Sequence, residues 1–313
     1  MKIKKLLLSC SLASAIFTSS YAYDLPGFNV GGTSFYDGAP GPAGSGWYFV
    51  EYLQYISADR LNDKDGNSLG LVKEDTDVFV PLSQLIYDTG IKWGNATPGV
   101  TVLLPWMAKS DVDDGANNAI LSSQTGMGDV TLGAFLQFDP IMGSSGPVFS
   151  HRFEIDITVP TGDYDAKNAI NPGANAWSVA PYYAATAWLT PKWTASARFI
   201  YLWNGKNDDP AKSLSATNNS QAGEAMNINF ASAYSISKNI SLGINGYYLK
   251  QLTDTQVDGQ DVLGRKEKVR AIGPGMVYNF SKEDSVFANV YFEDGAQNRA
   301  EGNRFVLRIN HHF

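Results

Sequence analysis

The sequence predicts an all-β protein, a transmembrane antiparallel up-and-down β-barrel of about 12 strands with both termini periplasmic. Stretches with an apolar residue at every second position recur from Trp47 to Phe313, and turn residues separate them without a sustained helical period. The connections alternate between short turns and longer polar loops, which is typical of outer-membrane barrels. Beyond residue 22 no apolar run approaches the ~18 residues of a spanning helix, so a place in a membrane requires a closed barrel.

The first 22 residues predict a secretory signal peptide. Three lysines stand among the first five residues, an apolar stretch follows from Leu6 to Phe17, and Ser20-Tyr21-Ala22 resembles a cleavage site. An alternative is lipid attachment at Cys10, within "LLSC", although few residues precede it. After cleavage at Ala22 the chain holds no cysteine, which excludes a disulfide scaffold. The remaining 21 basic and 31 acidic residues, without a basic cluster, argue against a nucleic-acid partner.

Residues 23–46 predict an irregular segment, because seven glycines and three prolines interrupt any regular period. Our hypothesis is that this segment folds into the lumen and constricts it, since glycine lets backbone pack closely against a wall. A disordered lead-in to the barrel is the alternative. The barrel itself is predicted to cover residues 47–313.

The pattern predicts twelve strands. They lie near 47–58, 75–88, 98–109, 127–139, 148–160, 174–189, 192–204, 223–236, 239–251, 267–280, 285–294 and 303–313. Short turns are expected at 189–193, 236–240 and 280–285, with somewhat longer ones at 88–98 and 139–147. Longer polar loops are expected near 59–74, 110–126, 161–173, 205–222, 252–266 and 295–302. An even number of strands returns both termini to the periplasm.

The two faces of each predicted strand differ. In "HRFEIDITV" (151–159) apolar side chains alternate with charged ones. An unpaired charge at the lipid-facing midplane costs roughly 2–4 kcal/mol, most for Arg and Lys, so we assign the charged face to the lumen. The lumen candidates are Arg152, Glu154, Asp156, Arg198, Glu293, Arg304 and Arg308. Such groups select solutes, or they pair with each other and fill a narrow barrel.

The tryptophans predict aromatic belts at two lipid–water interfaces, because all seven lie near strand ends. Trp47, Trp93, Trp188 and Trp193 lie near the amino terminus or short turns, and Trp106, Trp177 and Trp203 near longer loops. Trp188 shares the parity of inward residues, which requires a bulge near Pro181 or an inward ring.

The last strand, "NRFVLRINHHF", runs into the carboxyl terminus. Its outer face, Phe305, Leu307, Ile309 and Phe313, resembles the carboxyl-terminal signal that barrel-assembly machinery reads in outer-membrane proteins. Closure requires this strand to pair with the first one, so that no edge is left in lipid. The expected partners are therefore this machinery, outer-membrane lipid and lipopolysaccharide.

The sequence predicts no catalytic residue, metal site or cofactor. The three histidines, His151, His311 and His312, map to the short-turn end, and no G-x-S-x-G occurs. "LNDKDGN" fails as a calcium loop, because Leu61 and Val72 stand where an EF-hand needs carboxylates.

Several stretches carry a family resemblance. They are "GAPGPAGSGWYFVEYLQYISADRLNDKDGN" (38–67), "TGMGDVTLGAFLQFDP" (125–140), "HRFEIDITVPTGDYD" (151–165) and "NPGANAWSVAPYYAATAWLTPKWTASARFIYLWNGKN" (171–207). The chain resembles the outer-membrane family of meta-pathway phenol-degradation proteins. The resemblance implies a barrel associated with pathways that consume aromatic or other hydrophobic compounds, and it supplies no catalytic residues.

We therefore expect a passive outer-membrane channel for small organic solutes. Hydrophobic or aromatic solutes that feed a degradation pathway are favoured only through the resemblance. A structural or surface-interaction barrel with a closed lumen is the alternative. A secreted soluble β protein is a third, because a soluble sandwich also alternates apolar and polar residues.

Overall fold

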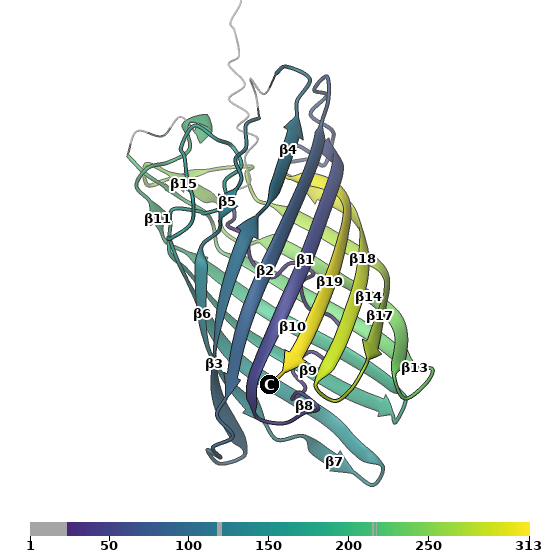
Figure 1. Cartoon of the computed structure of the whole chain (residues 1–313). Helices are drawn as coiled ribbons and strands as arrows, with labels where there is room; N and C mark the ends of the chain where they lie inside the picture. Colours follow the sequence, from purple (N-terminus) through teal and green to yellow (C-terminus); the bar gives the residue numbers. More distant parts are fainter. Residues whose placement is uncertain (1–23, 118–120, 215, 217) are drawn as a thin grey trace, which may run out of the picture.

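The computed structural model describes residues 24–117, 121–214, 216 and 218–313. The predicted signal peptide, including Cys10, lies outside these residues. Within them, twelve antiparallel strands form a closed barrel in which each strand pairs with its neighbours in sequence (Figure 1). The predicted fold class is confirmed. Among the described residues, no helix is long and apolar enough to cross a membrane.

The twelve strands lie within a few residues of their predicted positions. They are β1 (Gly46–Leu61), β2 (Asp75–Asp88), β3 with its continuation β4 (Ala96–Met107, Lys109–Asp113), β5 with β6 (Gly126–Met127, Val130–Phe138), β8 (Gly146–Val159), β9 (Ser178–Thr190), β10 (Trp193–Asn204), β13 (Ala225–Ser235), β14 (Ile240–Gln251), β17 (Lys268–Asn279), β18 (Asp284–Gln297) and β19 (Ala300–His312). The alternation of apolar residues that predicted these strands separates a lumen face from an outer face in each of them.

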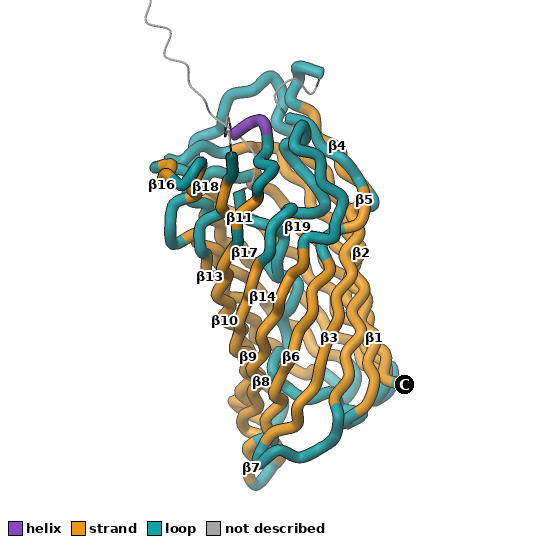
Figure 2. The backbone as a smooth tube through the Cα atoms, turned by 90° about the vertical axis from the view of Figure 1, so that its left-hand side faces the viewer, coloured by secondary structure: helices purple, strands orange, loops and turns teal. Residues whose placement is uncertain are grey.

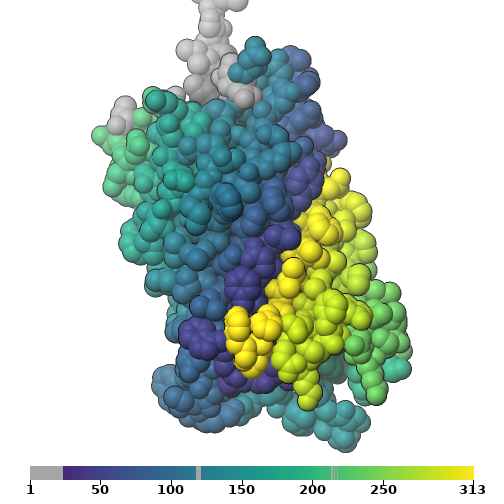
Figure 3. Space-filling view, in the orientation of Figure 1, coloured from purple at the N-terminus to yellow at the C-terminus, as the bar shows by residue number. Residues whose placement is uncertain are grey.

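The barrel closes where β19 pairs with β1, from Tyr48 opposite His312 to Leu61 opposite Ala300. Figure 3 shows this seam on the surface, where the yellow carboxyl-terminal strand lies beside the purple first strand. Phe305 and Ile309 are 42% and 40% exposed on the outer face of β19. Pairing of the last strand with the first is thus confirmed, whereas recognition by assembly machinery stays a prediction.

The two ends of the barrel differ. At one end the connections are short, although one carries a small extra strand, β7 (Ile141–Gly143), which pairs with β8. At the other end the longer connections hold a short helical turn, η1 (Lys212–Leu214), and a four-stranded sheet that the sequence did not predict (Figure 2). Its strands are β11 (Lys206–Asn207), β12 (Ser220–Gln221), β15 (Thr255–Val257) and β16 (Gln260–Val262).

One predicted loop is wrong. Residues 295–302 were expected to form a longer polar loop, but β18 extends to Gln297 and β19 begins at Ala300. Asn298 makes the tight turn between them with φ of 52°, a left-handed conformation that asparagine adopts more readily than most residues. Polar residues at the outer rim of a barrel remain compatible with strand pairing, so polarity alone did not mark the end of the strand.

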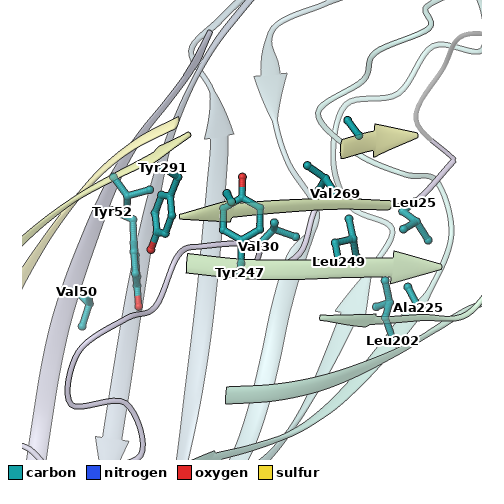
Figure 4. Close-up of a cluster of buried hydrophobic side chains, with 13 residues drawn as sticks. Leu25, Val30, Val50, Tyr52, Leu202, Ala225, Tyr247, Leu249, Val269 and Tyr291 are labelled. Atoms are coloured by element: carbon teal, nitrogen blue, oxygen red, sulfur yellow. The ribbon is translucent and has the colours of Figure 1, made fainter. Parts of the chain in front are cut away.

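Residues 24–45 run through the interior of the barrel along its length. The backbone N–H groups of Asp24 and Leu25 each donate to Glu267 Oε1 at 2.9 Å, in the long connection that precedes β17. The segment ends at Ser45, whose carbonyl oxygen lies 3.0 Å from His312 Nε2 at the short-turn end. Figure 4 shows Leu25 and Val30 of this segment among buried side chains of the barrel wall.

This path separates the two ends of the described chain. Asp24 lies at the loop end of the barrel and Phe313 at the short-turn end, which differs from the prediction that both termini lie on one side (Figure 1). The prediction counted strands only. A segment that crosses the lumen before β1 adds one more passage along the barrel.

Candidate functional site

The interior of the barrel holds a cavity of about 820 Å³. Its lining includes Lys282 and Glu283, in the short turn between β17 and β18, and Asn171 and Pro172, in the long connection between β8 and β9. The segment 24–45 also lines it along most of its length. The cavity therefore extends along the barrel, between this segment and the inner walls of the strands.

The lumen has an apolar wall and a polar wall. The apolar wall is the inner face of β1 to β3, whose cavity-lining side chains include Val50, Ile56, Val78, Leu82 and Leu103. The polar wall, from β8 to β19, carries the charged groups and buried asparagines such as Asn227, Asn229 and Asn289, interspersed with apolar side chains such as Leu202 and Leu249. The segment is hydrogen-bonded to the polar wall, for example from Gly31 N–H to Asn229 Oδ1 at 3.0 Å and from Tyr36 N–H to Ser196 Oγ at 3.0 Å. Val50 and Tyr52 of the apolar wall are buried in one cluster with Leu25 and Val30 of the segment, whereas Leu82 and Leu103 are left facing the cavity.

All seven predicted lumen residues line the cavity. They are Arg152, Glu154, Asp156, Arg198, Glu293, Arg304 and Arg308. Their role in selecting solutes stays a prediction, because position alone does not establish it.

The three candidates on β8 form one group. Arg152 Nη2 lies 2.6 Å from Glu154 Oε2, and the Tyr182 hydroxyl donates to the same carboxylate. The Arg152 guanidinium lies 3.5 Å from the centroid of the Phe135 ring. Asp156 lies beside Glu154, and this crowding requires Gly133: a Cβ there would lie 2.4 Å from Asp156 Oδ1 and 2.7 Å from Glu154 Oε1.

Arg198 holds the segment by a bidentate ion pair. Its Nε and Nη2 donate to the two carboxylate oxygens of Asp37 at 2.9 and 2.7 Å. The side chains are 11% and 6% exposed, so the pair is nearly removed from solvent. The guanidinium also stacks 3.9 Å from the centroid of the Tyr182 ring, which fixes its plane.

The remaining candidates have different partners. Arg304 Nη1 donates to the carbonyl of Val30 at 2.7 Å, which is a second arginine contact with the segment. Arg308 lies 3.7 Å from the centroid of the Phe287 ring. Glu293 accepts hydrogen bonds from the Tyr247 hydroxyl and, at 3.1 Å, from the Gly302 N–H.

A second ionic cluster holds the segment at the loop end. Arg265 donates to both carboxylate oxygens of Asp24, and Arg299 Nη1 lies 3.2 Å from Glu267 Oε2. Glu267 is 2% exposed and stands just outside β17. Burial raises the pKa of Glu267 to about 7, against the opposing influence of Arg299 and the Leu25 N–H.

Sequence reasoning missed three acids that attach the segment to the barrel: Asp24 and Asp37 within the segment, and Glu267 beside β17. Only a weak signal pointed to Asp37: it is one of two acidic residues in a segment otherwise rich in glycine and proline. Glu267 gave none, because an acid in a polar loop is ordinarily solvated.

Six of the seven tryptophans are well exposed. The exposed fractions are 47% for Trp47, 71% for Trp93, 53% for Trp106, 51% for Trp177, 47% for Trp193 and 41% for Trp203. Trp188 instead lines the cavity, which agrees with the inward ring that the sequence left open beside a bulge near Pro181. Trp188 of β9 pairs with Thr194 of β10, and the register shifts only after this pair, toward Trp193. Trp188 therefore points into the barrel, as Tyr182 and Thr186 do. Trp177 also borders the cavity, near its loop end.

The described residues contain no group of three or more His, Cys, Asp or Glu side chains placed to hold a metal ion. His151 faces outward and stacks on Phe138, with ring centroids 4.2 Å apart. His311 Nδ1 lies 2.7 Å from Asp284 Oδ1 near the carboxyl terminus.

Comparison with known families decides the assignment. Residues 58–309 match the family described as "Putative MetA-pathway of phenol degradation". The chain belongs to this family. No curated protein sequence matches the chain.

Comparison with solved structures agrees with the barrel fold. The chain is similar to an outer membrane channel from Pseudomonas putida F1, with a TM-score of 0.74 and 20% sequence identity over 86% of this chain and 96% of that one. Weaker similarities include the beta domain of the Bordetella autotransporter BrkA (TM-score 0.48, 9% identity, 86% and 100% covered) and a Pseudomonas aeruginosa FadL homologue (TM-score 0.41, 11% identity, 85% and 90% covered). The fold is that of outer-membrane β-barrels.

Proposed function

We propose that this protein is a passive channel of the outer membrane for small organic solutes. The observation that carries the proposal is the cavity of about 820 Å³, whose lining reaches from the short turns to the long connections. Twelve strands make a barrel between the side-chain-filled eight-stranded type and the aqueous porins of about 16 strands. A narrow passage is the expected result. The P. putida channel shares this fold.

The apolar wall of β1 to β3 favours hydrophobic or aromatic solutes. Ile56, Val80, Leu82 and Leu103 are only partly buried and line the cavity, so they offer a surface on which an apolar solute loses contact with water. The family description, which refers to phenol degradation, supports the same solute class and a place upstream of a degradation pathway.

The segment 24–45 acts as the constriction of this passage. It lines the cavity and is tied to the barrel by the Asp37–Arg198 and Arg265–Asp24 ion pairs, by the Arg304–Val30 hydrogen bond and by hydrogen bonds to buried asparagines. These contacts hold it against one wall, so the width of the passage depends on its presence.

In the membrane, the short-turn end and Phe313 face the periplasm and the long connections face outward. The exposed tryptophans then lie at the two interfaces, where they contact lipid and lipopolysaccharide. The outer face of β19 is the surface offered to the barrel-assembly machinery.

The alternative is a structural barrel with a closed lumen, and the segment inside the lumen is the observation that favours it. Liposome swelling distinguishes the two. Folded protein in liposomes should cause swelling in isotonic solutions of small neutral organic solutes, at rates that fall with solute size. Heat-denatured protein in the same lipid is the control. Folded protein that produces no solute-dependent swelling contradicts the channel and favours the closed barrel.

A further inference from the structure

The contact between Asp37 and Arg198 has the form of a ligand in a binding site. A free carboxylate on a planar guanidinium makes two parallel hydrogen bonds, and Asp37 makes this pair at 2.9 and 2.7 Å. Asp37 belongs to the irregular segment and not to the barrel wall. The wall supplies the arginine, and the segment supplies the anion.

The wall around this carboxylate is built in advance. The Tyr182 ring stacks on Arg198 at 3.9 Å, and the Phe287 ring stacks on Arg308 at 3.7 Å. Arg308 lines the same cavity as Asp37, and its positive charge favours the ionised Asp37 carboxylate. A stacked guanidinium keeps its plane fixed, so less rotational freedom is lost when it binds an anion.

The charge balance of the lumen depends on Asp37. Arg152 already has Glu154 as its partner at 2.6 Å. Within the part of the chain that the structure describes, neither Arg304 nor Arg308 forms an ion pair with a carboxylate. Without Asp37, Arg198 becomes a nearly buried cation that has lost its hydrogen-bonded partner and keeps only the weaker influence of Glu154 and Asp156, which is unfavourable unless another anion takes its place.

The site opens onto the cavity on its apolar side. Asp37, Arg198 and Arg308 all line the cavity, as do Tyr52 of β1 and its partly buried neighbour Leu82 of β2. A molecule with a carboxylate at one end and an apolar body at the other can therefore place its charge on Arg198 and its body toward the apolar wall.

We propose that Arg198, with Arg308 nearby, is a binding site for the carboxylate of small organic acids with an apolar body, and that Asp37 occupies this site as an internal substitute for the solute. This inference rests on the proposed channel function and names its solute class. Solute binding and the position of the segment then compete, because both require the same guanidinium.

Binding of benzoate to the full-length folded protein in detergent tests the site, with benzamide as the neutral analogue of the same shape. Asp37→Ala frees the arginine, so this variant should bind benzoate at least about tenfold more tightly than benzamide, the difference expected from hydrogen bonds to a charged partner. The unaltered protein should bind benzoate more weakly than the variant, because Asp37 competes. Asp37→Asn should also increase the preference for benzoate over benzamide. This variant replaces Asp37→Ala in the test if Asp37→Ala does not fold.

Two double variants locate the site. Asp37→Ala with Arg198→Met should lose the preference for benzoate, whereas Asp37→Ala with Arg265→Met, which removes the arginine at the other end of the segment, should keep it. Equal binding of benzoate and benzamide by folded Asp37→Ala overturns the proposal, as does a preference that survives Arg198→Met. Liposome swelling by the same variants separates the two claims: swelling without carboxylate preference refutes the site alone, and carboxylate preference without swelling refutes the channel alone.

Discussion

Glu51 is a charged residue on the outer face of the barrel. Its neighbours Val50 and Tyr52 line the lumen, so the alternation of β1 places Glu51 toward lipid. It stands four residues from Trp47 and four from Tyr55, which are both exposed, or about 13 Å along the strand from each. Ser83 Oγ donates to its carboxylate at 2.6 Å. A rule that assigns every charge to the lumen would have placed Glu51 wrongly.

Replacing this residue should increase stability. We predict that Glu51→Leu raises the free energy of unfolding by about 1 kcal/mol, because a carboxylate in the apolar band is unfavourable. Glu51→Gln, which removes the charge but can still accept from Ser83, should give a smaller gain. Unfolding by denaturant in lipid vesicles measures both. A clear loss of stability in Glu51→Leu would mean that the carboxylate has a favourable partner in the membrane.

At the scale of single residues, parity in the sequence identified which charges face the lumen, but not what they contact. Arg152 and Glu154 are two apart on one strand, so their pairing is local. Arg198 and Asp37 are far apart in sequence, and a glycine- and proline-rich segment carries no periodicity from which its register against the wall could be derived.

At the scale of elements, the strands were predictable because each alternates apolar and polar residues over most of its length. The segment 24–45 was recognised as irregular, yet its passage along the lumen depends on hydrogen bonds to distant strands, namely β6, β8, β9, β10, β13 and β19. The small sheet β11-β12-β15-β16 was missed because its strands have two or three residues each, too few to show a period.

The attachment of the segment at the loop end should depend on pH. The pKa of Glu267 is raised by burial from its ordinary 4.5 to about 7, so the neutral form is favoured in the folded protein. The stability of the folded protein that depends on neutral Glu267 is therefore complete below pH 4.5 and is lost as the pH rises through 7. We predict that the protection of the Leu25 N–H against hydrogen exchange with solvent falls between pH 5 and 8, after correction for the intrinsic exchange rate at each pH.

Glu267→Gln is the control for this effect, because an amide does not ionise in this range. Its protection at Leu25 should not change with pH. A rise in protection with pH in the unaltered protein would show that the charged hydrogen bonds from Arg299 and Leu25 outweigh burial.

The last strand tests assembly. Deleting Phe313 removes an exposed aromatic that directly follows β19, together with the hydrogen bond from its N–H to the carbonyl of Trp47 in β1. We predict at least a severalfold lower amount of folded protein in the outer membrane, measured by the heat-modifiable band on gels. Deleting the same number of residues from the Lys212–Leu214 turn is the control and should have little effect. Normal levels of folded protein without Phe313 would remove the assembly role.

At the scale of the whole molecule, twelve strands enclose a lumen that side chains alone do not fill, and the segment 24–45 takes up part of the remaining space. The passage that remains is narrow. One of its surfaces is mainly apolar, and the other carries the arginines. The sequence predicted the barrel and its family, whereas the division of the lumen into two walls emerged only from the positions of the strands around the ring.

Single-channel recording in planar bilayers tests the central claim most directly. The unaltered protein should conduct ions in small discrete steps, and deletion of residues 23–44 should raise the conductance severalfold, because the segment that narrows the lumen is gone. Both proteins must first show the heat-modifiable behaviour of a folded barrel. Equal conductance of the two would contradict the constriction, and the absence of conductance in both folded proteins would contradict the channel.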